Sequence, residues 1–208
     1  LNGKRKIFFI GDSHFAAMQF DLKQRVVDEN YEFLPRTIGG CLYLPNFTRK
    51  EVNKNLVMNQ CSLKYQNELR EELLANPNSI TIIGSRLPIY LTGTAFDNKE
   101  GGIEIHEGLK FEFKHIKDEY DFRKGIQVSI IELLENNNKV ILMYPIPAVG
   151  WNVPNKLFHD TPKRYIKEIK KNFNENPITT SYKVYKERTK ESFEIYNQIQ
   201  HKNIYRIY

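Results

Sequence analysis

Short apolar stretches alternate with amphipathic helical patterns along this chain of 208 residues. KRKIFFIG, SITIIG and NKVILMYP are nearly continuous in apolar residues, which is typical of strands buried on both faces of a parallel sheet. The predicted strands are residues 5–11, 31–36, 79–90, 138–151 and 202–208, and the predicted helices are residues 15–28, 62–77, 120–136 and 183–200. This order predicts an α/β domain whose mostly parallel sheet is covered on both faces by helices.

A different pattern occupies residues 92–117. GGIEIHEGLKFEFK alternates apolar and polar residues around Glu107 and Gly108, which is typical of an exposed hairpin. We therefore predict one domain over residues 1–208 with an inserted hairpin at 92–117. The chain is long enough to bury one sizeable core.

The distribution of charged residues limits the classes of partner that this chain can bind. The net charge is +6 and the pI is about 9.1, but the basic residues form no single stripe. The densest run, TPKRYIKEIKKNF, has the helical spacing of a solvated face, so we predict no nucleic-acid partner. A basic surface is compatible with an anionic polysaccharide or a membrane surface.

No apolar run approaches the roughly 20 residues of a membrane span, no signal sequence is visible, and the first residue is Leu1. We expect the chain to be part of a longer protein.

Four unusual loops follow the first four predicted strands: GDSH, GG, GSRLP and YPIPAVGW. In an open parallel sheet, the loops at the carboxyl ends of the strands form the ligand site. The sequence therefore predicts that these loops meet at one edge of the sheet.

Ser13 lies in the first of these loops, between a strand and a helix. There a serine can be a nucleophile next to the positive end of a helix, or Asp12 or Ser13 can simply be the N-cap of that helix. Gly39 and Gly40 would let a backbone amide approach a ligand closely, and Arg86 could bind a carboxylate or an oxyanion, or form an ordinary ion pair.

The two cysteines leave their state open. Cys41 and Cys61 would be independent thiols in a cytosolic protein and a disulfide in an exported one. No group of histidine, cysteine and aspartate residues has the spacing of a metal site, so we predict no metal.

The GDSH box resembles the first block of the SGNH hydrolase and transferase superfamily, and in particular the SGNH domain fused to acyltransferase family 3 membrane proteins. In that group a glycine precedes a cysteine, similar to GGCLYLP, and a second cysteine follows, like Cys61. A strand that runs into an arginine is similar to IIGSRLPIY. NKVILMYPIPAVGWNVP resembles the fourth strand with its proline-rich loop, and ESFEIYNQIQ resembles the last helix.

This resemblance implies a three-layer α/β/α, flavodoxin-like fold with about five strands. It implies that Ser13 is the acyl-accepting nucleophile, supported by a loop of Gly11, Asp12 and His14. The amides of Ser13 and Gly40, with Gly39 as the near alternative, would form the oxyanion hole. Arg86 would be a third donor or a substrate ligand. Cys41 and Cys61 would form a periplasmic disulfide.

The implied function is O-acetyl transfer to a hydroxyl of a bacterial surface polysaccharide, such as lipopolysaccharide O-antigen, through a serine acyl-enzyme. An N-terminal membrane domain of the parent protein would supply an acetyl group derived from acetyl-CoA, and the SGNH domain would lie in the periplasm and bind no cofactor. Two alternatives are an esterase that uses water as the acceptor and a non-catalytic glycan-binding domain. We expect substrate specificity to reside in residues 92–117 and in the loop between the cysteines.

The chain departs from the superfamily in one respect. The base and its orienting acid lie in an Asp-x-x-His box after the last strand of that superfamily, and no such box occurs here. We expect this chain to be a fragment that lacks that segment and is nearly inactive alone. His159, next to Asp160, is the internal substitute; the other histidines, His14, His106, His115 and His201, are poorly placed.

Overall fold

A computed structural model describes residues 4–27, 29–51, 56–57, 59–104, 111–117, 121–158, 171, 174–175 and 177–208. Its main sheet holds strands β1 (Arg5–Gly11), β2 (Tyr31–Thr37), β5 (Ile80–Gly84), β7 (Lys139–Met143) and β8 (Ile204–Ile207). The strand order is β2-β1-β5-β7-β8, and every pairing is parallel. This is the flavodoxin-like order, so the predicted fold class is confirmed.

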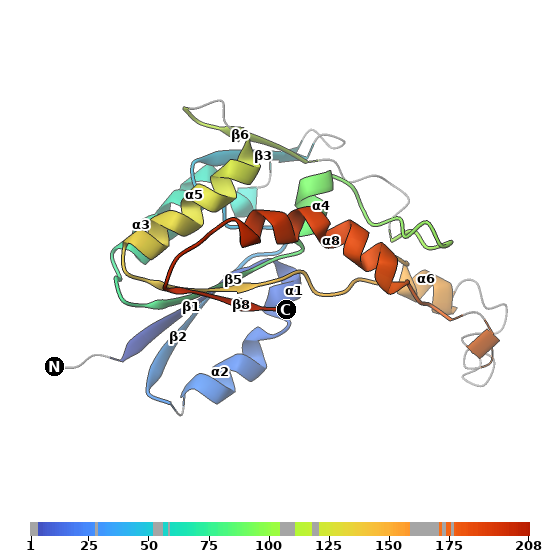
Figure 1. The fold of residues 1–208 in the computed structure, drawn as a ribbon, viewed down its shortest axis with the longest axis horizontal. Helices are drawn as coiled ribbons and strands as arrows, with labels where there is room; N and C mark the ends of the chain where they lie inside the picture. The colour runs from blue at the N-terminus through green and yellow to red at the C-terminus, as the bar shows by residue number, and fades with distance from the viewer. Residues whose placement is uncertain are drawn as a thin grey trace.

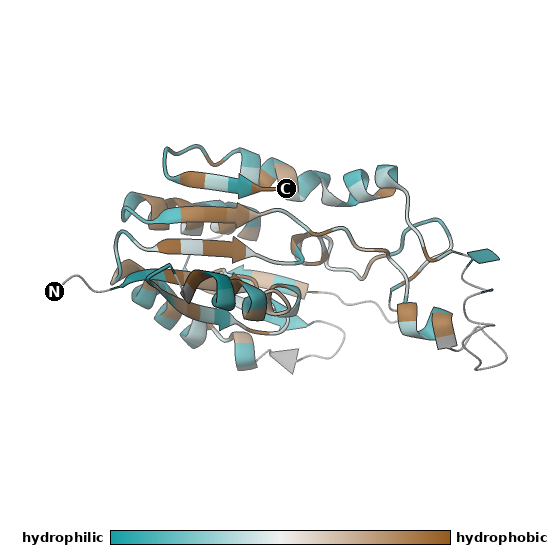
Figure 2. Cartoon of the chain, turned by 90° about the horizontal axis from the view of Figure 1, so that it is seen from below, coloured by the Kyte–Doolittle hydropathy of each residue, from teal (hydrophilic) through white to brown (hydrophobic). Residues whose placement is uncertain are grey.

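The residues of β1 alternate between two hydrophobic clusters. Phe8 and Ile10 face the larger cluster, and Ile7 and Phe9 face the smaller one. Because both faces of this strand are buried, its apolar run is continuous. The strands of the sheet that are open to view in Figure 2 are likewise mostly brown, the colour of hydrophobic residues.

The helices form the outer layers (Figure 1). The larger cluster lies under α3 (Leu63–Leu74), α4 (Leu87–Thr92), α5 (Phe122–Glu135) and α8 (Tyr182–Asn197). The smaller cluster lies against α1 (Ser13–Ala16) and α2 (Gln19–Val27). This second layer is uneven, because Tyr205 and Ile207 on β8 remain about half exposed. None of the described helices is long and apolar enough to cross a membrane.

The predicted helix over residues 15–28 is two helices. α1 ends after one turn, and α2 begins at Gln19. Phe15 is buried against Phe9, with ring centroids 5.6 Å apart, which fixes the direction of α1. The chain then turns so that Leu22 and Val26 of α2 pack against the smaller cluster. The predicted helix is therefore interrupted between Phe15 and Leu22, and both side chains pack in the smaller cluster.

The pairing over residues 92–117 also differs from the prediction. β6 (Phe111–His115) pairs antiparallel with β3 (Phe47–Glu51), which also pairs with β4 (Leu56–Val57), so a second sheet has the order β4-β3-β6. The predicted turn at Glu107 and Gly108 lies outside the described residues. Since β3 lies between the two cysteines in sequence, the segments expected to carry specificity are joined in one small sheet.

Candidate active site

Asp12, rather than Ser13, is the N-cap of α1. Its Oδ1 accepts a hydrogen bond from the His14 amide at 3.0 Å. Ser13 is the first residue of the helix and is exposed, and its hydroxyl makes no hydrogen bond within the described part of the chain. The capping role is thus filled by Asp12, and the Ser13 hydroxyl has no bonded partner among the described residues.

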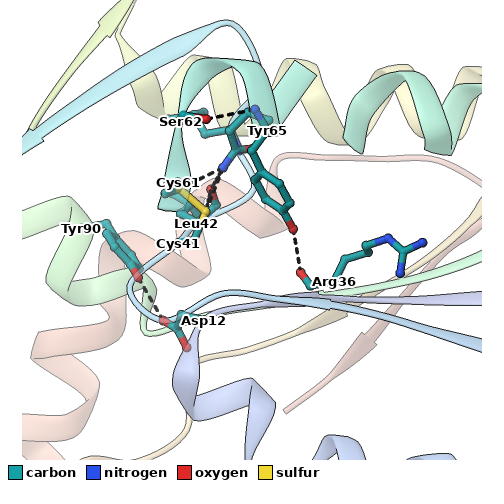
Figure 3. The surroundings of a disulfide bond; sticks show 10 residues. Asp12, Arg36, Cys41, Leu42, Cys61, Ser62, Tyr65 and Tyr90 are labelled. Carbon is teal, nitrogen blue, oxygen red and sulfur yellow. Dashed lines mark hydrogen bonds between the residues drawn. A yellow bond between two sulfur atoms is a disulfide. The ribbon is translucent and has the colours of Figure 1, made fainter. Parts of the chain in front are cut away.

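The Asp12 carboxylate joins the turn to the next rim loop. It is only 2% exposed, and its Oδ2 accepts a hydrogen bond from the Arg86 amide at 2.7 Å. The same oxygen accepts a hydrogen bond from the Tyr90 hydroxyl at 3.2 Å (Figure 3). A buried carboxylate is tolerated only when its hydrogen bonds are satisfied, as they are here. The backbone before and after Ser13 is therefore fixed by contacts that do not involve Ser13.

The double-glycine loop lies next to the same turn. The Ile38 amide donates to the Gly11 carbonyl at 3.0 Å, and the Cys41 amide donates to the Ile38 carbonyl at 3.0 Å, which closes a tight turn. Gly40 has a φ of 67°, which favours glycine, whereas a Cβ on Gly39 would meet nothing within 4 Å. Of the two glycines, Gly40 is the one that the turn requires.

Arg86 is the N-cap residue of α4, at the carboxyl end of β5. Its Nη2 contacts both carboxylate oxygens of Glu104, at 2.5 and 2.6 Å. The rim ion pair that sequence reasoning considered for Arg86 is therefore present, but it uses only one nitrogen of the guanidinium.

Cys41 and Cys61 form a disulfide, with their Cα atoms 5.4 Å apart. Figure 3 shows this bond beside Leu42. The Gln66 side chain lies against the disulfide: its Nε2 is 3.1 and 3.2 Å from the two sulfurs and donates to the Leu42 carbonyl at 2.7 Å. The bond thus joins the end of the double-glycine turn to the start of α3.

Replacing both cysteines with serine is expected to lower the free energy of unfolding by about 3 kcal/mol, because the bond closes a loop of 20 residues. Urea denaturation of the wild-type protein and of the C41S/C61S variant measures this difference. A reducing agent should lower the wild-type midpoint and leave the variant unchanged. Equal midpoints for the two proteins would contradict the prediction.

Two adjoining cavities lie along the rim on the side of His14, and Ser13 lines neither of them. One, of about 30 Å³, reaches from His14 and Arg86 to Phe96, Tyr185 and Arg188. The other, of about 480 Å³, reaches from His14, Arg86 and Glu104 to Trp151, and falls within the usual range of about 300–1,000 Å³ for ligand sites. Since both share His14, Arg86 and Ala148, they form one cleft, called here the rim cleft.

Asn98 holds the walls of the rim cleft together. Its Nδ2 donates to the Val149 carbonyl at 3.2 Å and to the Thr180 hydroxyl at 2.8 Å, and its Oδ1 accepts from the amides of Glu100 and Gly102, both at 2.8 Å. This side chain is fully buried, so the three wall segments that it bonds are fixed relative to one another.

His14 lies between Ser13 and the rim cleft. Partial burial lowers the pKa of its imidazole, and the charge of Arg86 lowers it further, against smaller opposite effects of Asp12 and Glu104. Because the folded-state pKa lies below the unfolded value, this residue favours unfolding as the pH falls through about 6.5.

The R86Q variant is expected to raise the pKa of His14, because it removes a repulsive charge and leaves Glu104. An NMR titration of the imidazole signals measures the shift. The matched R123Q variant removes a charge that is paired with Glu191 and should leave the His14 titration unchanged. A lower His14 pKa in R86Q would refute this electrostatic account.

Comparison with known proteins gives the family. A family model described as "SGNH domain (fused to AT3 domains)" matches residues 1–208. The chain belongs to this family. Among curated proteins, none matches this SGNH domain.

Solved structures that resemble this SGNH domain share little sequence with it. The periplasmic domain of a lipopolysaccharide acetyltransferase from Salmonella ser. Paratyphi A is 18% identical, with a TM-score of 0.42 over 85% of this chain; the chain spans 63% of that domain's length. TesA is 12% identical, with a TM-score of 0.36 over 94% of this chain and 100% of TesA. The acetyl xylan esterase AlAXEase is 22% identical, with a TM-score of 0.33 over 88% of this chain and 73% of that enzyme.

The remaining histidines of the SGNH domain lie away from Ser13 or outside the described residues. His115 is buried in β6 against Phe47. His201 precedes β8, so it lies at the amino-terminal end of the parallel strands, whereas Ser13 lies at their carboxyl end. His106 and His159, the latter considered as an internal base, are not among the described residues.

Sequence reasoning missed several residues of the site, among them Tyr90, Glu104, Trp151 and Arg188. Arg188 carried a usable signal, because it lies next to the inward positions of α8, such as Tyr185 and Thr189. Glu104 carried none, since an acidic residue in an alternating stretch is typical of any exposed strand.

Proposed function

We propose that this SGNH domain transfers an acetyl group to a hydroxyl of a bacterial surface polysaccharide through an ester on Ser13. The observation that supports this best is the exposed, unbonded Ser13 hydroxyl on a turn that Asp12 fixes from inside the protein. If Ser13 only capped the helix, its hydroxyl would be expected to accept a hydrogen bond from a backbone amide of the first turn.

The proposed reaction has two steps. The Ser13 oxygen attacks the carbonyl carbon of the donor's acetyl group while a base accepts the hydroxyl proton, and the base returns this proton to the donor, which leaves as its free thiol or alcohol. A sugar hydroxyl then attacks the Ser13 ester and gives its proton to the base, which passes it to the Ser13 oxygen as the acetylated sugar leaves. The amides of Ser13 and Gly40 would stabilise the oxyanion in both steps.

His14 is unsuited to act as the base for Ser13, although it is the next residue. Consecutive side chains of a helix do not face one another, and both residues belong to α1. All strands of the main sheet are parallel, so β8 ends at the same edge as β1, where Ser13 follows. We propose that an Asp-x-x-His segment after β8 supplies the acid and the base.

The donor side of the reaction follows from the family. Its domains are fused to AT3 domains, which supports a membrane acyltransferase partner in the same protein. We propose that this partner passes an acetyl group, derived from a cytoplasmic thioester, to the SGNH domain in the periplasm, and that no metal or bound cofactor takes part.

Acetyl trapping tests the proposal. The full-length protein is incubated with an activated acetyl ester, with and without a polysaccharide acceptor, and the modified residue is located by mass spectrometry. Ser13 should carry one acetyl group, which the acceptor removes faster than water does. Removal by water alone at an equal rate would identify an esterase, and a protein that is never acetylated would indicate a non-catalytic domain.

A further inference from the structure

Two arginines from distant parts of the sequence line the same part of the rim cleft. Arg86 comes from the start of α4 and Arg188 from the second turn of α8, and between them lie His14, Phe96 and Tyr185. A cavity that brings two cations together beside His14, the residue after Ser13, is a site for an anion if their charge is not already neutralised.

Arg188 is held rigidly by neutral groups. Its Nη1 donates to the Thr92 hydroxyl at 3.1 Å, its Nη2 donates to the Thr94 carbonyl at 3.0 Å, and its guanidinium lies 5.1 Å from the centre of the Phe96 ring. Among the described residues, no carboxylate lies within 4 Å of Arg188. The side chain is therefore oriented in advance, and its charge has no partner.

Arg86 is only partly neutralised. Glu104 contacts Nη2 alone, so Nε and Nη1 have no bonded partner among the described residues. Glu104 therefore bonds one nitrogen of one of the two guanidinium groups, and the buried Asp12 carboxylate contacts the Arg86 backbone amide rather than a guanidinium. Burial lowers the pKa of Arg188, the nearby Arg86 lowers it further, and the charge of Glu104 opposes them with a smaller effect.

We infer that this part of the rim cleft binds an acidic group, a carboxylate or a phosphate, on the acceptor glycan. This inference rests on the proposed function. The unused N–H groups of Arg86 and Arg188 would hold the anion, and a guanidinium suits either group through paired hydrogen bonds. The cavity beside Arg188 measures about 30 Å³, so the acidic group would enter it, and the sugar ring would lie in the adjoining cavity of about 480 Å³. An acidic sugar bound here lies next to the turn that carries Ser13.

Binding to the full-length protein tests this without any chemistry at Ser13. Calorimetry compares glucuronate with its neutral analogue glucuronamide at constant ionic strength, and glucose 6-phosphate with glucose. At least one acid should bind about tenfold or more tightly than its neutral partner, as one charge-assisted contact predicts. The acid with the larger gain identifies carboxylate or phosphate. Equal affinities within both pairs would overturn the inference.

Matched variants locate the effect. R188Q should abolish the preference for the acid, whereas K190Q, which removes an exposed charge on the same helix, should leave it unchanged. Equal losses in both variants would show a diffuse charge effect and overturn the site. If R188Q does not fold, chemical shifts of the wild-type Arg188 Nε–H decide: they should move with the preferred acid and stay still with its neutral analogue.

The outcome is independent of the acetyl-transfer test. A protein that binds the acid but never acetylates Ser13 would retain the anion site and lose the proposed function. A protein that acetylates Ser13 but binds acid and neutral analogue equally would retain the function and lose the anion site.

Discussion

Replacing Ser13 with alanine is expected to abolish acetylation of the protein and to lower acetyl transfer by more than about a thousandfold, because the proposed ester has no other oxygen on which to form. The measurement is intact-mass spectrometry of the full-length protein after incubation with an activated acetyl ester, together with the rate of acetyl transfer to polysaccharide. Acetyl labelling that persists at the same site and rate in S13A would eliminate Ser13 as the nucleophile.

Ser181 provides the matched control. It is also an exposed serine at the start of a helix, but its hydroxyl caps α8 by accepting from the Val184 amide at 3.3 Å. S181A should therefore lose about 1 kcal/mol of stability and keep full labelling. S13A should lose less than about 0.5 kcal/mol, since Asp12 caps α1. The opposite pattern would indicate that Ser13 has a structural role and would contradict the interpretation.

Replacing Gly84 with alanine is expected to destabilise the fold by more than about 3 kcal/mol. A Cβ at this position would overlap the ring of Phe15, which is only 1% exposed and lies against the strand end. Since Phe15 follows Ser13 by two residues, a variant that still folds should also displace the Ser13 turn. Urea denaturation measures the first effect, and the rate of acetylation measures the second.

Gly39→Ala is the control for this substitution. A Cβ there meets nothing within 4 Å, so the free energy of unfolding should change by less than about 0.5 kcal/mol. If G84A and G39A were equally stable, the packing of Phe15 against β5 would not be the contact that positions the turn.

The sequence was sufficient to predict the five strands of the main sheet, because the signal for each of them is local. Two strands were predicted too long: the predicted strand 79–90 ends as β5 at Gly84 and continues into α4, and the predicted strand 138–151 ends as β7 at Met143. An apolar run such as IFFI in β1 is buried on both faces, and its length excludes a helix of ordinary size. The carboxyl edge followed from the same argument, since parallel strands bring the GDSH, GG and GSRLP loops together wherever the helices lie. The family resemblance is confirmed by the match over the whole chain.

The second sheet and much of the rim cleft were not predictable in this way. The strands β6 and β3 are far apart in the sequence, since Phe47 pairs with His115 and Glu51 with Phe111. The alternation of apolar and polar residues alone cannot distinguish that partner from a neighbouring strand. Likewise, the contact of Arg86 with Glu104 depends on how the segment after α4 folds back. Long-range partners of this kind leave no periodic trace in a single sequence.

The buried Asp12 carboxylate and the buried Asn98 amide serve different parts of the molecule and share no bonded partner. In the proposed function, Asp12 would fix the position of the Ser13 oxygen, and Asn98 would fix the shape of the cleft that receives the sugar. Under that proposal, a lineage could change the residues around Asn98 and acquire a new acceptor while it keeps the same acyl chemistry.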